Sequence, residues 1–237
     1  MSGRIDAFAG EPRVALIHAL AHSVSPINVA MRHSWPEAVC MNLLDDSLSA
    51  DLARNTAAGG VGLDEAMHQR FEALAAYAES TGAQALLFTC SAFGSCIEAV
   101  AARRPHMPVL KPNEAMVDEA VAVAAGGRIG LIASFAPTLA SMPAEFPPGV
   151  DLVTALSAEA MDALNRGDVD LHDALVVKAA LTLKEQGCAV VALAQFSMAR
   201  AQGAVEQAVG LPVLTTPDSA IRVLRQRLQS KVAVKQA

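Results

Sequence analysis

The segment Phe88-Thr-Cys-Ser-Ala-Phe-Gly94 places a cysteine directly after an apolar run and before a stretch of helical character. The aligned peptide dipoles at the start of a helix lower the pKa of a thiol, so Cys90 is a candidate acid/base or nucleophile. The next residues, Ser91 and Ala92, are small enough for a substrate to approach closely. The alternative is a buried cysteine that only fills space in the core, a common role for this residue.

The segment Leu193-Ala-Gln-Phe-Ser-Met-Ala199 has the same setting, but Gln195 stands where the first segment has its thiol. An amide does not exchange protons usefully near neutral pH, yet it can donate a hydrogen bond to a carboxylate or an oxyanion. We therefore expect Gln195 to line the site, with Phe196 and Ser197 as substrate-binding neighbours. The alternatives are a turn residue that bonds nearby backbone for Gln195 and a helix cap for Ser197.

Both segments belong to an internal repeat, which indicates a duplicated structural unit. Apolar runs of strand type alternate with amphipathic stretches of helical type, and this alternation is typical of parallel sheets covered by helices. The three aligned pairs of segments are 13–27 with 128–142, 81–94 with 186–199, and 108–115 with 212–219.

The elements that must position these residues can be predicted in the same way. Strands are expected over 13–17, 38–44, 85–88, 108–110, 128–132, 151–154, 190–193 and 212–214. Helices are expected over 64–80, 91–103, 170–186 and 198–209, after Asn113, and from Thr216 onward.

The predicted fold is α/β, with two pseudo-symmetric Rossmann-like lobes, each a parallel sheet with its helices. We expect residues 1–107 plus 211–237 in the first lobe and residues 108–210 in the second. Ligands of open parallel sheets bind outside the carboxyl ends of the strands, so the active site is expected in the cleft between the lobes.

The duplication, the turn around Cys90 and the Pro-Val-Leu strands together resemble the aspartate/glutamate racemase superfamily. This group includes amino-acid and hydantoin racemases, maleate isomerase and arylmalonate decarboxylase, and the resemblance spans most of the chain. Members typically carry a cysteine after the third strand of each half, and Cys90 matches the first. The segment LAQFSM resembles the hydantoin-racemase motif Leu-Gly-Cys-Ala-Gly-Met, so Gln195 falls where the second cysteine would be.

The resemblance implies further binding residues in the loops after the first strand of each half. Relatives bind a carboxylate at the loop that corresponds to residues 134–138, which makes Ser134 and Thr138 candidates. In the other half, His22 and Ser23 are the candidates for contact with substrate. His18 and His22 could also supply a second base, because imidazole titrates near neutrality, and a structural histidine is the alternative for each.

The expected function is a cofactor-independent racemase or isomerase that acts at a carbon next to a carboxylate or carbonyl group. Its substrate would be small and anionic, with Cys90 as the acid/base. A two-base racemase needs a titratable group on each side of the carbon, and Gln195 departs from that pattern. The alternatives are a one-sided decarboxylase of the arylmalonate type, whose cysteine lies in the second half rather than the first, and a non-catalytic protein that binds a small acid.

The composition of the chain and the motifs that it lacks further limit the possible classes of function. The net charge is −6, which argues against a nucleic-acid surface, and no apolar stretch is long enough to cross a membrane. The N-terminal segment has no signal-peptide core, so a cytoplasmic location is expected. Phosphate-binding and metal-binding motifs are absent, and we expect neither a cofactor nor a metal. The remaining cysteines (Cys40, Cys96 and Cys188) are expected in the core, and the resemblance implies a homodimer.

Overall fold

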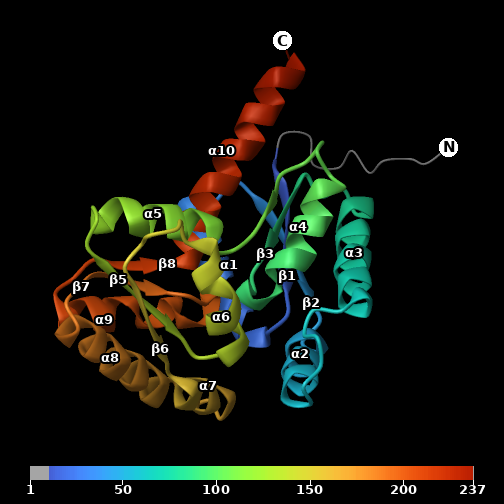
Figure 1. Cartoon of the computed structure of the whole chain (residues 1–237). Coiled ribbons are helices and arrows are strands. Elements are labelled where there is room, and N and C mark those ends of the chain that lie inside the picture. Colours follow the sequence, from blue (N-terminus) through green and yellow to red (C-terminus); the bar gives the residue numbers. More distant parts are fainter. Residues whose placement is uncertain (1–10, 237) are drawn as a thin grey trace. The chain divides into compact units, whose positions relative to one another are not determined.

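The computed structural model describes residues 11–236 of the chain, which divides into two compact units (Figure 1). The first unit, here called the first lobe, combines the chain up to Lys111 with the segment from Ala220 onward. The second lobe is the continuous segment Pro112–Ser219. Residues 1–10 and 237, which the sequence assigns to the first lobe, lie outside the described residues.

The first lobe is built on a parallel four-stranded sheet. Its order is β2 (Val39–Leu44), β1 (Arg13–His18), β3 (Ala85–Phe88) and β4 (Val109–Leu110). The helical elements between the strands are η1 (Ala21–Ser23), α1 (Val24–Ser34), α2 (Ser47–Ala57), α3 (Glu65–Ser80), η2 (Ser91–Phe93) and α4 (Gly94–Ala102), where η denotes a 3-10 helix.

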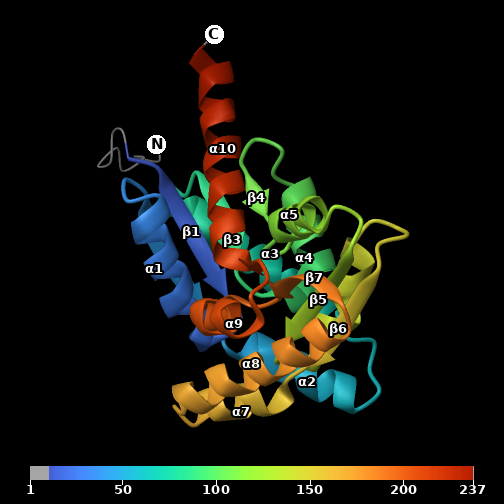
Figure 2. The same cartoon turned by 90° about the vertical axis from the view of Figure 1, so that its left-hand side faces the viewer.

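The second lobe repeats this sheet. Its order is β6 (Leu152–Leu156), β5 (Arg128–Ala133), β7 (Cys188–Leu193) and β8 (Val213–Thr215), again all parallel. Its helical elements are α5 (Glu114–Ala124), α6 (Ala136–Ser141), η3 (Met142–Glu145), α7 (Ala158–Asn165), α8 (Val169–Glu185), η4 (Phe196–Ala201) and α9 (Gln202–Val209). The last helix, α10 (Thr216–Gln236), begins in this lobe and continues into the first (Figure 2).

The duplication extends to individual backbone hydrogen bonds. Thr89 N–H donates to Ile17 O at 3.0 Å, and in the second lobe Ala194 N–H donates to Ile132 O at 2.9 Å. The turn after the first strand of each lobe also matches. Ser23 N–H donates to Leu20 O at 3.1 Å, and Thr138 N–H donates to Phe135 O at 3.0 Å. The aligned segments of the sequence therefore have the same local structure.

The sheet of the second lobe is covered on both faces. Ile129 and Leu131 of β5 belong to a core cluster with residues of α5, whereas Ile132 belongs to a second cluster with α8 and α9. Successive strand residues point to opposite faces, so one strand supplies both cores. Gly130 lets α8 approach, because a Cβ there would lie 2.8 Å from Leu183 Cδ1. Figure 1 shows α5 on one side of this sheet and α8 with α9 on the other.

In the first lobe, α3 is fixed at both ends and along one face. Asp64 Oδ1 accepts a hydrogen bond from Met67 N–H at 2.8 Å and so caps the helix start. Gly82 follows the helix with a φ of 88°, in the left-handed region that glycine adopts readily. Between these ends, Phe71 stacks on Phe88 of β3 with ring centroids 5.3 Å apart. The expected helix over 64–80 is confirmed to within one residue.

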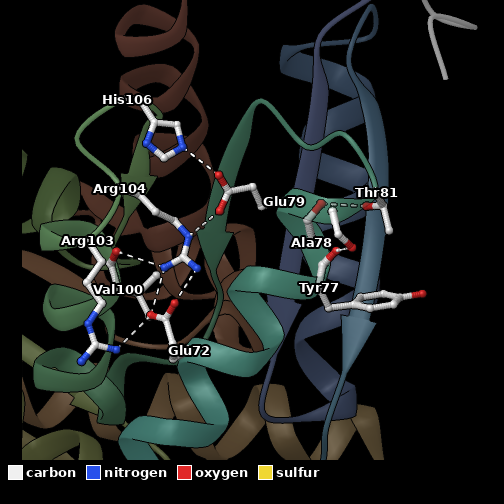
Figure 3. Close-up of polar contacts among 10 residues, drawn as sticks. Glu72, Tyr77, Ala78, Glu79, Thr81, Val100, Arg103, Arg104 and His106 are labelled. Atoms are coloured by element: carbon white, nitrogen blue, oxygen red, sulfur yellow. Dashed lines mark hydrogen bonds and ion pairs between the residues drawn. The ribbon is translucent and has the colours of Figure 1, made fainter. Parts of the chain in front are cut away.

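A buried arginine joins α3 to the connection between α4 and β4 (Figure 3). The side chain of Arg104 is 5% exposed, and it donates to Glu72 at 2.6 Å and to Glu79 at 3.1 Å. It also donates to the carbonyl of Val100. Glu79 accepts a further hydrogen bond from His106 at 2.8 Å. Each guanidinium nitrogen of Arg104 therefore has a hydrogen-bond partner, and the cluster links elements within the first lobe.

Two of the sequence predictions differ from the structure. The predicted lobe boundaries assign 108–110 to the second lobe and 212–214 to the first, but β4 pairs with β3 and β8 pairs with β7. Each short strand thus completes the sheet of its own repeat. The stretches after β1 and β5 were expected to be loops, yet they form α1 and α6, because a parallel connection has to cross back over its sheet.

Candidate functional site

Cys90 lies at the carboxyl edge of the first sheet. Ile17 of β1 pairs with Phe88 of β3, and Cys90 follows two residues later, immediately before the short helix η2. The residue is half-buried, and Ser49 Oγ lies 4.0 Å from its sulfur. Ser91 and Ala92 are buried within η2, and the backbone N–H of Ala92 bonds the sulfur. The thiol therefore sits at the edge where parallel sheets bind ligands.

The prediction that a helix start lowers the pKa of Cys90 is wrong in direction. Burial raises the pKa of this thiol above its ordinary value, and the hydrogen bonds from Ala92 and Ser49 oppose that shift without reversing it. The physical reason is that the thiolate loses more hydration than one N–H and one hydroxyl return. Cys90 is consequently protonated at neutral pH in this structure.

Ser49 is a neighbour of Cys90 that the sequence did not reveal, since helix α2 was not predicted. Two ion pairs hold α2 in place, because Arg70 of α3 donates to Asp45 and to Asp51 at 2.7 Å each. Burial alone would raise the pKa of Asp45, but the hydrogen bonds from Ser47 and Arg70 outweigh it and the pKa is lowered. The cluster fixes the first turns of α2 and with them the position of Ser49.

His18 is fully buried at the end of β1, and both of its ring nitrogens form hydrogen bonds with polar side chains. Its Nε2 lies 2.9 Å from Asn42 Oδ1, and its Nδ1 lies 2.8 Å from Thr89 Oγ1. Burial lowers its pKa, although the bond to Asn42 opposes the shift. The amide oxygen of Asn42 only accepts, so Nε2 carries the proton and Thr89 donates to Nδ1. Both ring nitrogens of His18 thus have partners, and the contact with Thr89 orients the residue before Cys90.

Gln195 occupies the matching position at the carboxyl edge of the second sheet. Ile132 of β5 pairs with Leu193 of β7, and Ser134 and Gln195 both follow two residues later. The Gln195 side-chain oxygen accepts from Ser134 N–H at 2.5 Å, from Ser134 Oγ at 3.1 Å and from Phe135 N–H at 3.1 Å. The sequence-based alternative, a glutamine that bonds nearby backbone, describes these contacts.

Two buried hydroxyls stand at the same edge of the second sheet. Ser197 lies in η4 and Thr216 directly follows β8. Within residues 11–236, Ser197 Oγ and Thr216 Oγ1 are buried atoms without a hydrogen-bond partner. A buried hydroxyl without a partner costs free energy, so both atoms are candidate donors to a ligand. From the sequence, Thr216 was expected only as the start of the last helix.

The remaining predicted site residues all lie in short helical elements, including those that were expected in loops. Phe196 is buried in η4, next to Gln195, and Thr138 is buried in α6. His22 and Ser23 form part of η1, after β1, and Ser23 is buried whereas His22 is half-buried. The role of His22 stays a prediction.

The other cysteines have structural positions. Cys96 is buried in α4, and burial raises its pKa to about 11. Cys188 is buried at the start of β7, and Cys40 is half-buried in β2. Over residues 11–236 no group of three or more His, Cys, Asp or Glu side chains is arranged to hold a metal ion. None of the helices in that range has the length and apolar character needed to cross a membrane.

The family follows from these features together with a direct sequence match. The model of the Asp/Glu/Hydantoin racemase family matches residues 27–224, and the chain belongs to this family. The expected resemblance is therefore confirmed, as is the α/β fold with two parallel sheets. No match was found among curated protein sequences.

Solved structures support the same fold at low sequence identity. Glutamate racemase from Francisella tularensis, in complex with D-glutamate, is 12% identical over 93% of this chain and 81% of that chain, with a TM-score of 0.71. Allantoin racemase from Klebsiella pneumoniae is 15% identical over 95% and 89%, with a TM-score of 0.60. A mutant of arylmalonate decarboxylase is 15% identical over 92% of each chain, with a TM-score of 0.56.

Proposed function

We propose that this protein is a cofactor-independent racemase or isomerase in which Cys90 exchanges a proton at a carbon next to a carboxylate or carbonyl group. The substrate is a small anion. The observation that carries the proposal is the thiol at the carboxyl edge of the first sheet, next to the Ser49 hydroxyl and the Ala92 N–H. The family is named after Asp, Glu and hydantoin racemases, and D-glutamate is bound in one of the similar structures.

The neighbours of Cys90 can stabilise its thiol when the thiol becomes negatively charged during the reaction. When the thiol gives up its proton, Ser49 and Ala92 donate hydrogen bonds to the sulfur and lower the cost of the thiolate. Thr89, held by His18, fixes the backbone directly before Cys90. In the second lobe, Ser197 and Thr216 are buried hydroxyls that can donate hydrogen bonds to a ligand.

A second candidate function, a one-sided decarboxylase, is favoured by two observations. The raised pKa keeps Cys90 protonated near neutral pH, which suits a proton donor, and Gln195 has no titratable group. In that reaction the bond between the carbon and a carboxylate breaks and carbon dioxide leaves. The electron pair stays on the enediolate, and the thiol proton of Cys90 is transferred to the carbon.

Proton NMR in heavy water tests both candidates with a panel of amino acids, hydantoins, maleate and substituted malonates. We expect Cys90-dependent exchange of the proton next to the carboxylate, abolished in Cys90→Ala, while Cys40→Ala serves as the matched control and keeps full activity. Loss of optical purity supports the racemase, and conversion of maleate supports the isomerase.

The same experiment separates the remaining possibilities. Release of carbon dioxide with one handedness retained supports the decarboxylase. Full activity in Cys90→Ala would refute both assignments. Saturable binding of panel compounds without any turnover would instead favour the non-catalytic small-acid binding protein.

A further inference from the structure

Three hydrogen-bond donors of the second lobe converge on a single oxygen atom, and the chain itself supplies that oxygen. The donors are the N–H and hydroxyl of Ser134 and the N–H of Phe135, here called the oxygen-binding turn. They lie 2.5, 3.1 and 3.1 Å from Gln195 Oε1. Such an arrangement of donors is also what a substrate oxyanion or carboxylate oxygen would require.

The length of the glutamine side chain explains why the contact exists in this lobe. A cysteine ends one atom beyond Cβ, whereas Gln195 carries its oxygen two carbons further and reaches from β7 to the turn after β5. In the first lobe the equivalent residue is Cys90, whose sulfur bonds within its own turn through Ala92 and contacts Ser49 of α2. Replacing a thiol by glutamine thus changes which turn the side chain binds.

The contact is also hard for a ligand to displace. Gln195 is 8% exposed and Ser134 is 3% exposed, so the three hydrogen bonds are shielded from water. A substrate carboxylate would have to lose its hydration and expel an oxygen that is already tethered in place. Ser134 and Phe135 would meanwhile gain no additional hydrogen bond, because the number of acceptors at the turn stays the same.

We propose that Gln195 is a specificity-determining residue that keeps the oxygen-binding turn closed to substrate carboxylates. The side-chain oxygen of Gln195 is bound by Ser134, so the NH2 group is the part of this amide that can still donate a hydrogen bond to a ligand. The second lobe then binds one neutral or singly charged oxygen group through this amide and the Ser197 hydroxyl. The substrate class is a small anion with one carboxylate, which favours the racemase over the decarboxylase, because a substituted malonate carries two carboxylates.

This inference rests on the proposed function only where it places a substrate at this edge of the second sheet. The closure of the oxygen-binding turn rests on the contacts alone. It is therefore tested without substrate, by thermal unfolding in sodium formate against sodium chloride of the same ionic strength. Formate is the smallest carboxylate, and a ligand that binds only the folded state raises the melting temperature.

We expect formate to raise the melting temperature of the wild type less than that of Gln195→Ala, each relative to chloride, because the oxygen-binding turn is closed in the wild type. In Gln195→Ala the turn loses its oxygen, the melting temperature falls, and formate restores part of it in a saturable manner, by about 2 °C or more. Adding Ser134→Ala to this variant removes one donor and should reduce the formate effect. Gln202→Ala, which also loses a glutamine bond to backbone, is the matched control and should respond no more than the wild type.

Two results would overturn the proposal. One is an equal response to formate in wild type and Gln195→Ala, since the turn would then already be open. The other is the absence of any formate effect in Gln195→Ala and in Gln195→Ser, which is the second variant in case the first does not fold. Because no turnover is measured, a failure of the proposed enzyme activity leaves either result unaffected.

Discussion

The Cys90 thiol carries the proposed chemistry, and its reactivity depends on one hydroxyl that contacts it from another helix. Burial favours the thiol, whereas Ser49 favours the thiolate, to which its hydroxyl can donate a hydrogen bond. We expect Ser49→Ala to raise the pKa of Cys90 further, because the thiolate loses a donor while its burial stays the same. Iodoacetamide, which reacts with thiolates, then modifies Cys90 more slowly at a given pH.

The measurement is the rate of Cys90 alkylation as a function of pH, followed by mass spectrometry of the peptide. In the wild type the midpoint is expected above the ordinary thiol value of 9.0. Ser80→Ala is the matched control, because Ser80 donates to Tyr77 O within α3 instead of to the sulfur. A midpoint below 9.0 in the wild type, or equal shifts in the two variants, would contradict this account.

How far the sequence could predict the candidate residues depends on where their partners lie along the chain. Cys90 and Gln195 were found because each follows an apolar run in an aligned pair of segments. The direction of the Cys90 pKa was missed, because burial depends on packing that no local pattern encodes. Ser134 was proposed as a carboxylate-binding residue, but its bond to Gln195 spans a long stretch of chain and follows only from the pairing of β5 with β7.

The helices and strands also differ in how well the sequence predicts them. All eight strands within residues 11–236 were predicted within a few residues, since short apolar runs are distinctive. Helix α2 was missed because its sequence Ser-Leu-Ser-Ala-Asp-Leu buries only Leu48, Ser49 and Leu52. The ion pairs of Arg70 with Asp45 and Asp51 tie this helix to α3, a segment that is distant in sequence, so no local pattern reveals them.

The Arg104 cluster (Figure 3) makes a prediction about how elements of the first lobe are held together. Arg104→Met removes the shared partner of Glu72 and Glu79 from a position that is 5% exposed. We expect a loss of about 2–4 kcal/mol in the free energy of unfolding, measured in urea, because two carboxylates remain near each other without their cation. Arg103→Met, with a side chain that is 65% exposed, should change it by less than about 0.5 kcal/mol.

The pH dependence supplies a second readout for the same pair of variants. The hydrogen bond from Arg104 lowers the pKa of Glu72 below its ordinary value of 4.5. A lowered folded-state pKa contributes stability above the unfolded value, and this contribution is lost as the pH falls through the folded value. The difference between wild type and Arg104→Met should therefore shrink below about pH 4.5. If the difference in the free energy of unfolding between the two proteins stays constant from pH 7 to 3, the variant has lost packing only and not the ion pair.

At the scale of the whole molecule, the internal duplication predicted the architecture well. The boundary between the two lobes was the part of the architecture that the sequence predicted least well. The aligned Pro-Val-Leu segments showed that the two halves match, but not which sheet each short strand joins. That depends on pairing, and β4 and β8 each complete their own lobe. The chain then returns to the first lobe through α10, whose Arg225 stacks on Trp35 at 5.9 Å and donates to Ser34 O. The expected pairing of chains into a dimer stays a prediction.

This connectivity predicts different behaviour for the two lobes when they are separated. The second lobe is one continuous segment, 112–219, with a complete sheet and a core on each face. We expect the isolated segment to fold and to unfold cooperatively in urea, followed by circular dichroism. The chain up to residue 111 lacks α10, whose Ile221 and Leu224 are buried, and should be much less stable alone than when residues 220–237 are attached through a short linker. Gradual, non-cooperative unfolding of 112–219 would contradict the view that each repeat is a complete folding unit.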